Sequence, residues 1–272
     1  MFVTTQAGTV LEIDLEENKV LSKWDSKENR NILGIQRIDN ILYVCTQSKL
    51  YKLELPSYKK LKRKRFRDNS FHHIMIRDGF IYLTSTAKNA IIRVNMKFRK
   101  KKIFYIDPPI KDEPVIWKKN YNHLNNICYY KGKYYIDLNW LTTTQFSDSG
   151  VAVLNEDFEE IDRFKFGWQT HCFCWIEDKK HALCATTNKE EAQHPLKSGL
   201  MVEGDLVFDH GLDYYSKYFL KDENHYYIFA GETGKREDRG KHDGIVFILD
   251  NDYNLVKKHE FPKTGGFSGA TF

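Results

Sequence analysis

The sequence has no long apolar segment and no N-terminus of the secretory type. No apolar run approaches the roughly 20 residues needed to cross a bilayer, so we expect no transmembrane segment. The first residues, MFVTTQAGTVLEIDLEEN, have no charged region, no long apolar core and no small-residue cleavage site, which are the marks of a signal peptide. We therefore expect the chain to begin inside a strand.

Cysteine is scarce and odd in number. The five residues are Cys45, Cys128, Cys172, Cys174 and Cys184. An odd count within apolar runs, without a secretory signal, predicts reduced core thiols in a cytoplasmic protein. Cys172 and Cys174 form a C-x-C pair on one face of an expected strand. A metal-binding pair is the alternative to structural thiols, but no second C-x-C or C-x-x-C would complete a tetrahedral site.

Proline is also scarce, whereas aromatic residues are abundant. The chain has 6 Pro against 18 Phe and 16 Tyr, and Val and Ile are spread along its length. Aromatic and β-branched side chains are favoured in strands, so the composition indicates an all-β protein. A length of 272 residues allows either two domains or one large all-β domain.

One pattern recurs five times, a strand followed by a polar turn and a second strand. Its plainest copy includes HHIMIRDGFIYLTSTAKNAIIRVN at 72–95. Copies begin at positions 31, 70, 123, 171 and 215, which are 39, 53, 48 and 44 residues apart. A third and a fourth strand follow each copy, least clearly in GLMVEGDLVFDHG. This period is the size of a four-stranded propeller blade.

The two ends of the chain complete each other. GGFSGATF at 265–272 has the pattern of a first strand with nothing after it, and residues 1–24 have that of strands two to four. Joined together they form a sixth blade, which closes the ring and removes its free edges. We predict a six-bladed β-propeller of four-stranded antiparallel blades, with one domain over 1–272. Five blades with an N-terminal cap, or a pair of β-sandwiches, are the alternatives.

The segments HLNNI, THCFCW and GETGKRED…GIVFILDNDYN resemble an uncharacterised branch of six-bladed propellers. With the blade spacing and the closure, the chain resembles propellers of the gluconolactonase, strictosidine-synthase and NHL-repeat type. The resemblance implies a site on the face where inner strands begin and where loops between second and third strands open. A calcium site of the gluconolactonase kind has only weak support, from Asn31, Asn125 and Glu232.

Three of those second-to-third loops are long, at 138–150, 186–199 and 231–244. Long loops on one rim of a compact scaffold are usually functional. Histidines gather at the same rim, since His123 and His171 begin inner strands of neighbouring blades. With Glu232 as base or ligand, they would provide proton transfer or hold a divalent metal ion. The alternative is that each histidine only bonds a backbone carbonyl of the next blade.

The doublet His72–His73 offers a further ligand, and alternation along a strand allows at most one of the two to share a site with His123. The last long loop, GETGKREDRGKHDG, adds Arg236, Arg239 and His242. Arginine holds carboxylate or phosphate through two parallel hydrogen bonds, so the loop would suit a sugar acid or a phosphorylated compound. A solvated loop with internal Glu–Arg pairs is the alternative. The segment GETGKREDRGKHDG contains no phosphate-loop motif.

Two basic runs stand apart from these loops. KKLKRKRFR (59–67) and KFRKKK (97–102) fall on the fourth strands of consecutive blades, so they would lie side by side on the outer rim. Such a patch could dock a polyanion or a protein. Lysine on an exposed edge strand also prevents edge-to-edge pairing, which would explain part of this charge.

Two functions follow from these features, and the sequence leaves the choice between them open. In the first, histidines at the funnel act on a polar or anionic small molecule, in a metal-assisted hydrolase or lactonase-like enzyme. In the second, the protein is a non-catalytic scaffold that recognises a protein, glycan or polyanion through its loop face or basic rim. The fold alone does not decide between them, because propellers host both classes.

Overall fold

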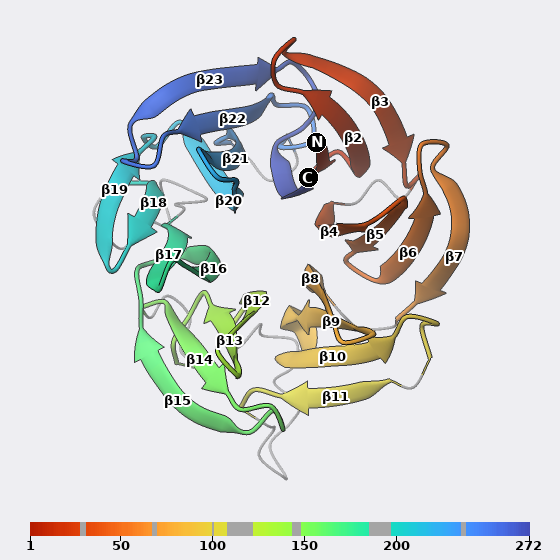
Figure 1. The fold of residues 1–272 in the computed structure, drawn as a ribbon, viewed down its shortest axis with the longest axis vertical. Coiled ribbons are helices and arrows are strands. Elements are labelled where there is room, and N and C mark those ends of the chain that lie inside the picture. The colour runs from red at the N-terminus through yellow and green to blue at the C-terminus, as the bar shows by residue number, and fades with distance from the viewer. Residues whose placement is uncertain are drawn as a thin grey trace.

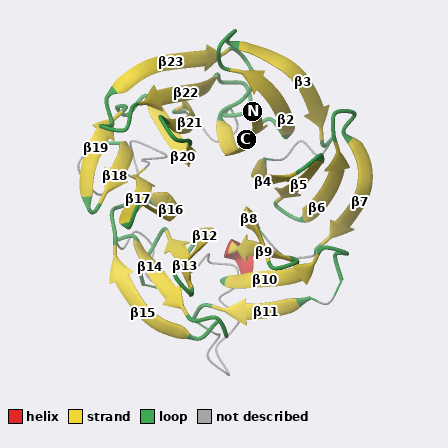
Figure 2. Ribbon diagram, in the orientation of Figure 1, coloured by secondary structure: helices red, strands yellow, loops and turns green. Residues whose placement is uncertain are grey.

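Six four-stranded antiparallel sheets form a closed ring in the computed structural model, which describes residues 1–27, 31–66, 70–99, 101–107, 122–142, 148–184, 197–234 and 238–272. The sheets are arranged around a common axis, with one strand of each nearest the centre (Figure 1). The prediction of a six-bladed β-propeller is confirmed. Strand is the dominant structure, and the one short helix among the described residues is η1 (Thr86–Lys88) (Figure 2).

Blades 1 to 3 follow one another along the chain, each from its inner strand outwards. Blade 1 contains β4 (Ile32–Ile38), β5 (Ile41–Thr46), β6 (Lys49–Glu54) and β7 (Lys59–Arg65). Blade 2 contains β8 (Phe71–Arg77), β9 (Phe80–Ser85), β10 (Ala90–Asn95) and β11 (Lys102–Tyr105). Blade 3 contains β12 (Leu124–Tyr130), β13 (Lys133–Leu138), β14 (Gly150–Leu154) and β15 (Glu160–Lys165).

Blades 4 and 5 repeat this order, and blade 6 joins the two ends of the chain. Blade 4 contains β16 (Thr170–Ile176), β17 (Lys179–Cys184), β18 (Gly199–Val202) and β19 (Asp205–Asp209). Blade 5 contains β20 (Tyr214–Lys221), β21 (Tyr226–Glu232), β22 (Gly244–Leu249) and β23 (Leu255–Phe261). Blade 6 contains β24 (Phe267–Thr271), β1 (Phe2–Thr5), β2 (Thr9–Asp14) and β3 (Lys19–Asp25).

The last blade closes as the sequence predicts. The C-terminal strand β24 pairs antiparallel with the N-terminal strand β1, with Val3 opposite Ala270, and both termini lie near the centre of the ring (Figure 1). The side chains of Thr4 and Ser268 are 3.3 Å apart at this junction. β24 pairs with β1 and packs between the inner strands β20 and β4 of the neighbouring blades, so blade 6 closes the ring.

Local turn chemistry explains the tight hairpin between the first two strands of two blades. The turn after β8 has Asp78 and Gly79 at φ 50° and 75°, and the turn after β12 has Lys131 and Gly132 at 45° and 79°. Two successive residues with positive φ define the hairpin turn whose twist matches that of the strands, and glycine adopts it at little cost. The RDG and YKG signals therefore fix the register of two blades.

The core lies between blades rather than at the axis. Each pair of neighbouring blades encloses its own cluster of buried apolar side chains. The interface that closes the ring, between blades 5 and 6, buries Val3, Leu11, Phe229 and Phe267. Burial of such side chains is the main stabilising term of the fold. No helix among the described residues is long and apolar enough to span a membrane.

The inner strands depart from regular alternation near their beginnings. The pairing register shifts at Leu33, His72, Asn125–Asn126, Cys172–Phe173, Lys217 and Ser268. Each shift is a β-bulge, in which an extra residue leaves the ladder and its side chain is redirected. Cys172 lies in the bulge of β16 with φ 58°, so the C-x-C pair is not part of a regular ladder.

Candidate functional site

The beginnings of four inner strands present nitrogen-bearing side chains around the axis, two of them from bulges. His72 lies in the bulge of β8, and Lys217 lies in the bulge of β20. His171 is paired with Leu183 immediately before the bulge of β16, while His123 directly precedes β12. All four are near the starts of inner strands, which converge at the centre of the ring (Figure 1). Together with Arg239 they form what we call the axial cluster.

Two of the histidines are in ring contact across neighbouring blades. The centroids of His72 and His123 are 4.7 Å apart, with the rings nearly perpendicular. His123 also contacts the edge of Trp140, at 5.6 Å. Of the histidine doublet, then, His72 lies against His123. His73 lies elsewhere, stacked on Tyr218 at 5.8 Å.

The pKa of His171 reflects the charge of this cluster. Its side chain is buried, and its Nδ1 is 3.0 Å from the carbonyl oxygen of Gln169. Burial lowers the pKa of His171 well below its ordinary value, and the positive charges of Lys217, His123 and Arg239 lower it further. Burial and nearby positive charge both disfavour a protonated imidazole, so His171 is neutral at pH 7 within a cationic environment.

The aromatic ring of Tyr215 packs against two of the cations. The guanidinium carbon of Arg239 is 5.0 Å from the centre of the Tyr215 ring, and the Lys217 ammonium is 5.9 Å from it. These distances are in the range of cation–π attraction. The Tyr215 ring is fully buried, and burial raises the pKa of its hydroxyl above the ordinary value. That hydroxyl has no hydrogen-bond partner within the described part of the chain.

Two glycines allow Tyr215 to occupy this position. A Cβ atom added to Gly266 would lie 2.5 Å from the Tyr215 hydroxyl oxygen, and one added to Gly231 would lie 2.5 Å from the Cα of Gly266. Both distances are too short for a side chain. The close approach of the backbones therefore requires glycine at both positions.

Arg239 is held by the junction between blades 5 and 6. Its carbonyl oxygen accepts a hydrogen bond from the backbone of Gly266 at 3.2 Å, and its Nε is 3.5 Å from the carbonyl oxygen of Gly234. The neighbouring His242 carbonyl accepts from Gly265 at 2.8 Å. The described part of the last long loop is thus tied to the start of the closing strand, which positions Arg239 at the axis.

Other predicted site residues have different surroundings. Glu232 is exposed, and its carboxylate accepts a hydrogen bond from the backbone of Asp243 at 3.4 Å. His242 contacts the carbonyl oxygen of Glu232 through Nδ1 at 3.3 Å. None of the hydrogen bonds or ring contacts found among the described residues joins Glu232 to His123 or His171, so the triad stays a prediction. Arg236 lies outside the described residues.

Asn125 connects neighbouring blades, while its side-chain oxygen, Oδ1, is buried with no hydrogen-bond partner among the described residues. Its amide donates to the carbonyl oxygen of Thr170 at 2.5 Å, and its own carbonyl accepts from the Thr84 hydroxyl at 3.2 Å. Asn126 forms a reciprocal pair with the backbone of Phe173, at 2.8 and 2.9 Å. These contacts fasten blade 3 to both of its neighbours. They are the kind of structural bond that was the alternative for the axial histidines.

The residues present do not fit the expected divalent metal. Among the described residues no group of three or more His, Cys, Asp or Glu side chains is arranged to hold a metal ion. The axial cluster instead combines imidazoles with two side chains that carry permanent positive charge. Cations repel a metal ion, and they attract carboxylate and phosphate groups.

Lys217 is the member of the axial cluster that the sequence reasoning missed. Tyr215 begins the fifth aligned copy, but strict alternation from Tyr215 gives no reason to separate Lys217 from the other residues of the strand. The bulge between Ser216 and Tyr218 places it at the axis. Lys217 lies two residues after the start of its aligned copy at position 215, as His72 does in the copy that starts at position 70, and this shared offset was the available signal.

The two basic runs lie side by side, and part of their charge is used between blades. Lys62 and Lys64 of β7 donate to the carbonyl oxygens of Lys97 and Phe98, at 2.7 and 2.6 Å. The exposed cations of β7 are Lys59, Lys60, Arg63 and Arg65. Within the described part of the chain none of these four forms an ion pair with a carboxylate. Positions 67 and 100 are outside the described residues.

Comparison with known proteins identifies the architecture. No protein-family model matches the chain, and no match is found among curated proteins. Solved structures do match, including a protein of unknown function from Bacteroides caccae, with a TM-score of 0.70, 13% identity and coverage of 98% of this chain and 96% of that one. A chain of a nidogen/laminin complex matches with a TM-score of 0.65, 12% identity and coverage of 98% and 96%.

The β-propeller domain of Swd1 from Myceliophteria thermophila is also similar, with a TM-score of 0.53, 14% identity and coverage of 96% of this chain and 83% of that one. At such low identity the likeness extends to the fold alone. The functional argument therefore depends on the axial cluster and its surroundings.

Proposed function

We propose that the protein binds a small anionic molecule at the axis of the propeller, within the axial cluster of His72, His123, His171, Lys217 and Arg239. One observation carries this proposal. Among the described residues, the charges that act most strongly on the buried ring of His171 are those of Lys217, His123 and Arg239, and all three are cationic. A site of one charge sign inside a low-dielectric scaffold concentrates ligands of the opposite sign.

The chemistry of the cluster favours a carboxylate or a phosphate. Arg239 offers a planar fork of N–H donors and Lys217 a point charge, and both bind oxyanions. His72 and His123 add ring N–H groups, while the half-buried Trp140 provides an aromatic face for the carbon skeleton. A sugar acid or a phosphorylated small molecule matches this combination of charge and ring surface.

A metal-assisted hydrolase or lactonase is the enzymatic alternative, and its main support is the resemblance to gluconolactonase-type propellers. Among the described residues no group of three or more His, Cys, Asp or Glu side chains is arranged to hold a metal ion, which supports anion binding over the metal enzyme. Under this proposal, elemental analysis of the purified protein finds no stoichiometric divalent metal. A stoichiometric metal that disappears in His123→Ala, with the fold retained, would favour the enzyme.

The basic rim supports a second candidate, docking of a polyanion or an acidic protein surface. The contacts of Lys62 and Lys64 hold blades 1 and 2 together, and the four exposed cations of β7 then form one stripe on the outer edge. Similar propellers include a chain of a nidogen/laminin complex, so an outer surface that engages a partner is consistent with the fold. Binding that is lost between low and high salt is the mark of this second candidate.

We also infer that residues 1–272 act as one domain in the cytoplasm. All five cysteines are free, and Cys45, Cys172 and Cys184 are buried in the core. Reduced thiols are typical of a reducing compartment. Alkylation of freshly lysed cells under denaturing conditions checks this inference, since it should modify all five thiols without prior reduction.

The primary test is calorimetric titration with glucose 6-phosphate, gluconate and inorganic phosphate, with uncharged glucose as the matched ligand. Lys217→Met and Arg239→Met should each weaken binding about 10- to 100-fold, because each removes a charged hydrogen-bond donor. Lys23→Met, on the exposed strand β3, is the control and should leave affinity unchanged. Equal affinity for glucose and its phosphate, or wild-type affinity in both axial variants, would contradict the proposal.

A further inference from the structure

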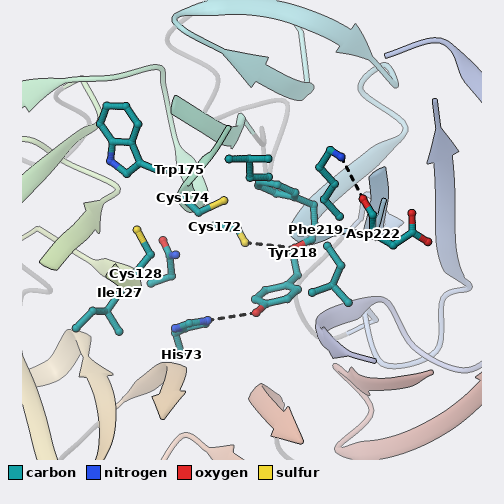
Figure 3. A pocket seen from close by; sticks show the side chains of 13 residues that line it. His73, Ile127, Cys128, Cys172, Cys174, Trp175, Tyr218, Phe219 and Asp222 are labelled. Atoms are coloured by element: carbon teal, nitrogen blue, oxygen red, sulfur yellow. Dashed lines mark hydrogen bonds between the residues drawn. The ribbon is translucent and has the colours of Figure 1, made fainter. Parts of the chain in front are cut away.

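We propose a second ligand site, a cavity of about 420 Å³ between the inner strands of blades 2 to 5, which takes a neutral aromatic molecule carrying a hydroxyl group. The cavity is lined by later residues of the same strands that begin at the axial cluster. Figure 3 shows His73 and Tyr218 on one side and Trp175 on another, with Cys128, Cys172 and Cys174 among the lining side chains. Its volume is within the range of small-molecule pockets.

The inner wall of the cavity is uncharged at pH 7. Burial raises the pKa of the Cys172 thiol to about 12, and it also raises the pKa of Cys128 and Cys174 above the ordinary value. Burial raises the pKa of Tyr218 as well, and it lowers the pKa of His73 to about 4. The thiols are protonated and therefore weak nucleophiles, so the wall favours non-covalent binding of a neutral molecule.

The two charged residues of the lining, Lys221 and Asp222, already interact with other protein groups. Lys221 is 3.4 Å from Glu177, and Asp222 accepts a hydrogen bond from the Tyr227 hydroxyl at 2.6 Å. An ionic ligand would lose its hydration without gaining a partner of opposite charge. The thiols do not form a metal site either, because no suitable group of three metal-ligating side chains is present among the described residues.

Unpaired polar atoms in the wall indicate where the ligand's polar group binds. His73 is only 8% exposed, and its Nδ1 has no hydrogen-bond partner among the described residues. Its Nε2 is 3.5 Å from the Tyr218 hydroxyl. The Nε1 atom of Trp175 is also buried, and it too has no hydrogen-bond partner among the described residues. Buried polar groups are normally paired, and a hydroxyl both donates and accepts, so it pairs with either tautomer of His73.

Aromatic walls favour a flat ligand. The ring of Trp175 is stacked on Tyr130 at 5.1 Å, and Tyr218 is stacked on His73 at 5.8 Å. These contacts hold the rings in fixed orientations, and aromatic rings prefer offset stacking or edge contacts with another ring. A two-ring aromatic alcohol has the shape, the neutrality and the single polar group that the cavity requires.

The test uses 2-naphthol as probe and 2-methylnaphthalene as its matched analogue, which has a methyl group in place of the hydroxyl. Direct fluorescence or ligand-observed NMR titration at pH 7 should give about tenfold weaker binding for the methyl compound, as loss of one neutral hydrogen bond predicts. The charged analogue 2-naphthoate should fail to displace bound 2-naphthol. Equal affinity of 2-naphthol and 2-methylnaphthalene would overturn the assignment of the polar group.

Variants separate this cavity from the axial cluster. Cys174→Phe fills the cavity and should abolish 2-naphthol binding, and His73→Phe should weaken it to the level of the methyl compound. Lys217→Met, which impairs the axial cluster, should leave 2-naphthol binding unchanged, so the two proposals succeed or fail independently. Circular dichroism confirms the fold of each variant. Unchanged binding in folded Cys174→Phe, or no binding to the wild type, would overturn the site.

Discussion

His210 illustrates how a single buried histidine makes the fold sensitive to acid. Its Nδ1 is 3.0 Å from the carbonyl oxygen of Gly211 and its Nε2 is 3.0 Å from the hydroxyl of Ser216, while its ring stacks on Phe247 at 5.4 Å. Nδ1 donates and Nε2 accepts, so the neutral ring satisfies both contacts. Burial lowers the pKa of His210 to about 4.

This lowered pKa predicts a loss of stability as the pH falls. Below the unfolded-state value of about 6.5 the unfolded chain binds a proton that the folded chain excludes until about pH 4. Stability from His210 is complete above pH 6.5, and it should fall by about 2 kcal/mol between pH 7 and pH 5. Chemical unfolding of the wild type and His210→Gln at both values measures this effect.

The difference between the two pH profiles is the useful quantity, because other titrating groups are common to both proteins. Asp137 acts in the opposite direction, since burial raises its pKa to about 7 and the folded chain retains a proton that the unfolded chain releases. The His210→Gln variant should therefore have the shallower loss on acidification. Parallel profiles would show that His210 does not titrate as described.

At the scale of single elements, the sequence predicts strands and turns well and bulges poorly. Turns such as RDG can be recognised in the sequence, because glycine and polar residues are needed where φ is positive. A bulge has no such signature, because the extra residue can be histidine, asparagine or lysine. Hence His72 and His171 were selected by their residue type, while Lys217 was missed and Asn125 was expected to bind a ligand. The sequence does not show the hydrogen bonds that join Asn125 to the neighbouring blades.

Gly266, directly before the closing strand β24, allows a test of whether close packing on Tyr215 positions the axial cluster. Gly266→Ala should lower the free energy of unfolding by about 1–3 kcal/mol, because its new methyl group meets the Tyr215 hydroxyl and the Gly231 backbone. It should also weaken anion binding, since Tyr215 and the backbone that holds Arg239 must shift. Thermal unfolding and calorimetric titration with glucose 6-phosphate measure the two effects.

Gly240→Ala is the matched control, from the same junction. Its added methyl group would meet Ala7 at 3.4 Å, an ordinary contact, so stability and affinity should stay close to those of the wild type. Equal behaviour of Gly240→Ala and Gly266→Ala would mean that the packing around Tyr215 does not position the axial cluster.

At the scale of the whole molecule, the closed ring brings segments far apart in sequence to one axis. His72, His171 and Arg239 come from blades 2, 4 and 5, and only the ring makes them neighbours. The sequence predicts that ring from its repeat and its complementary ends. It does not predict the sign of the charge at the axis, because histidine suits a metal site and an anion site equally. The permanent charges of Lys217 and Arg239 favour the anion.

Crystallographic location of selenate, an anomalous scatterer similar to phosphate in charge and shape, tests the anionic site most directly. Crystals grown with selenate should give an anomalous peak at the axis, within hydrogen-bond distance of the Lys217 ammonium and the Arg239 guanidinium. Crystals of Lys217→Met should lose that peak. Ordered selenate found only along the exposed cations of β7, with none at the axis, would contradict the axial site and favour polyanion docking at the rim.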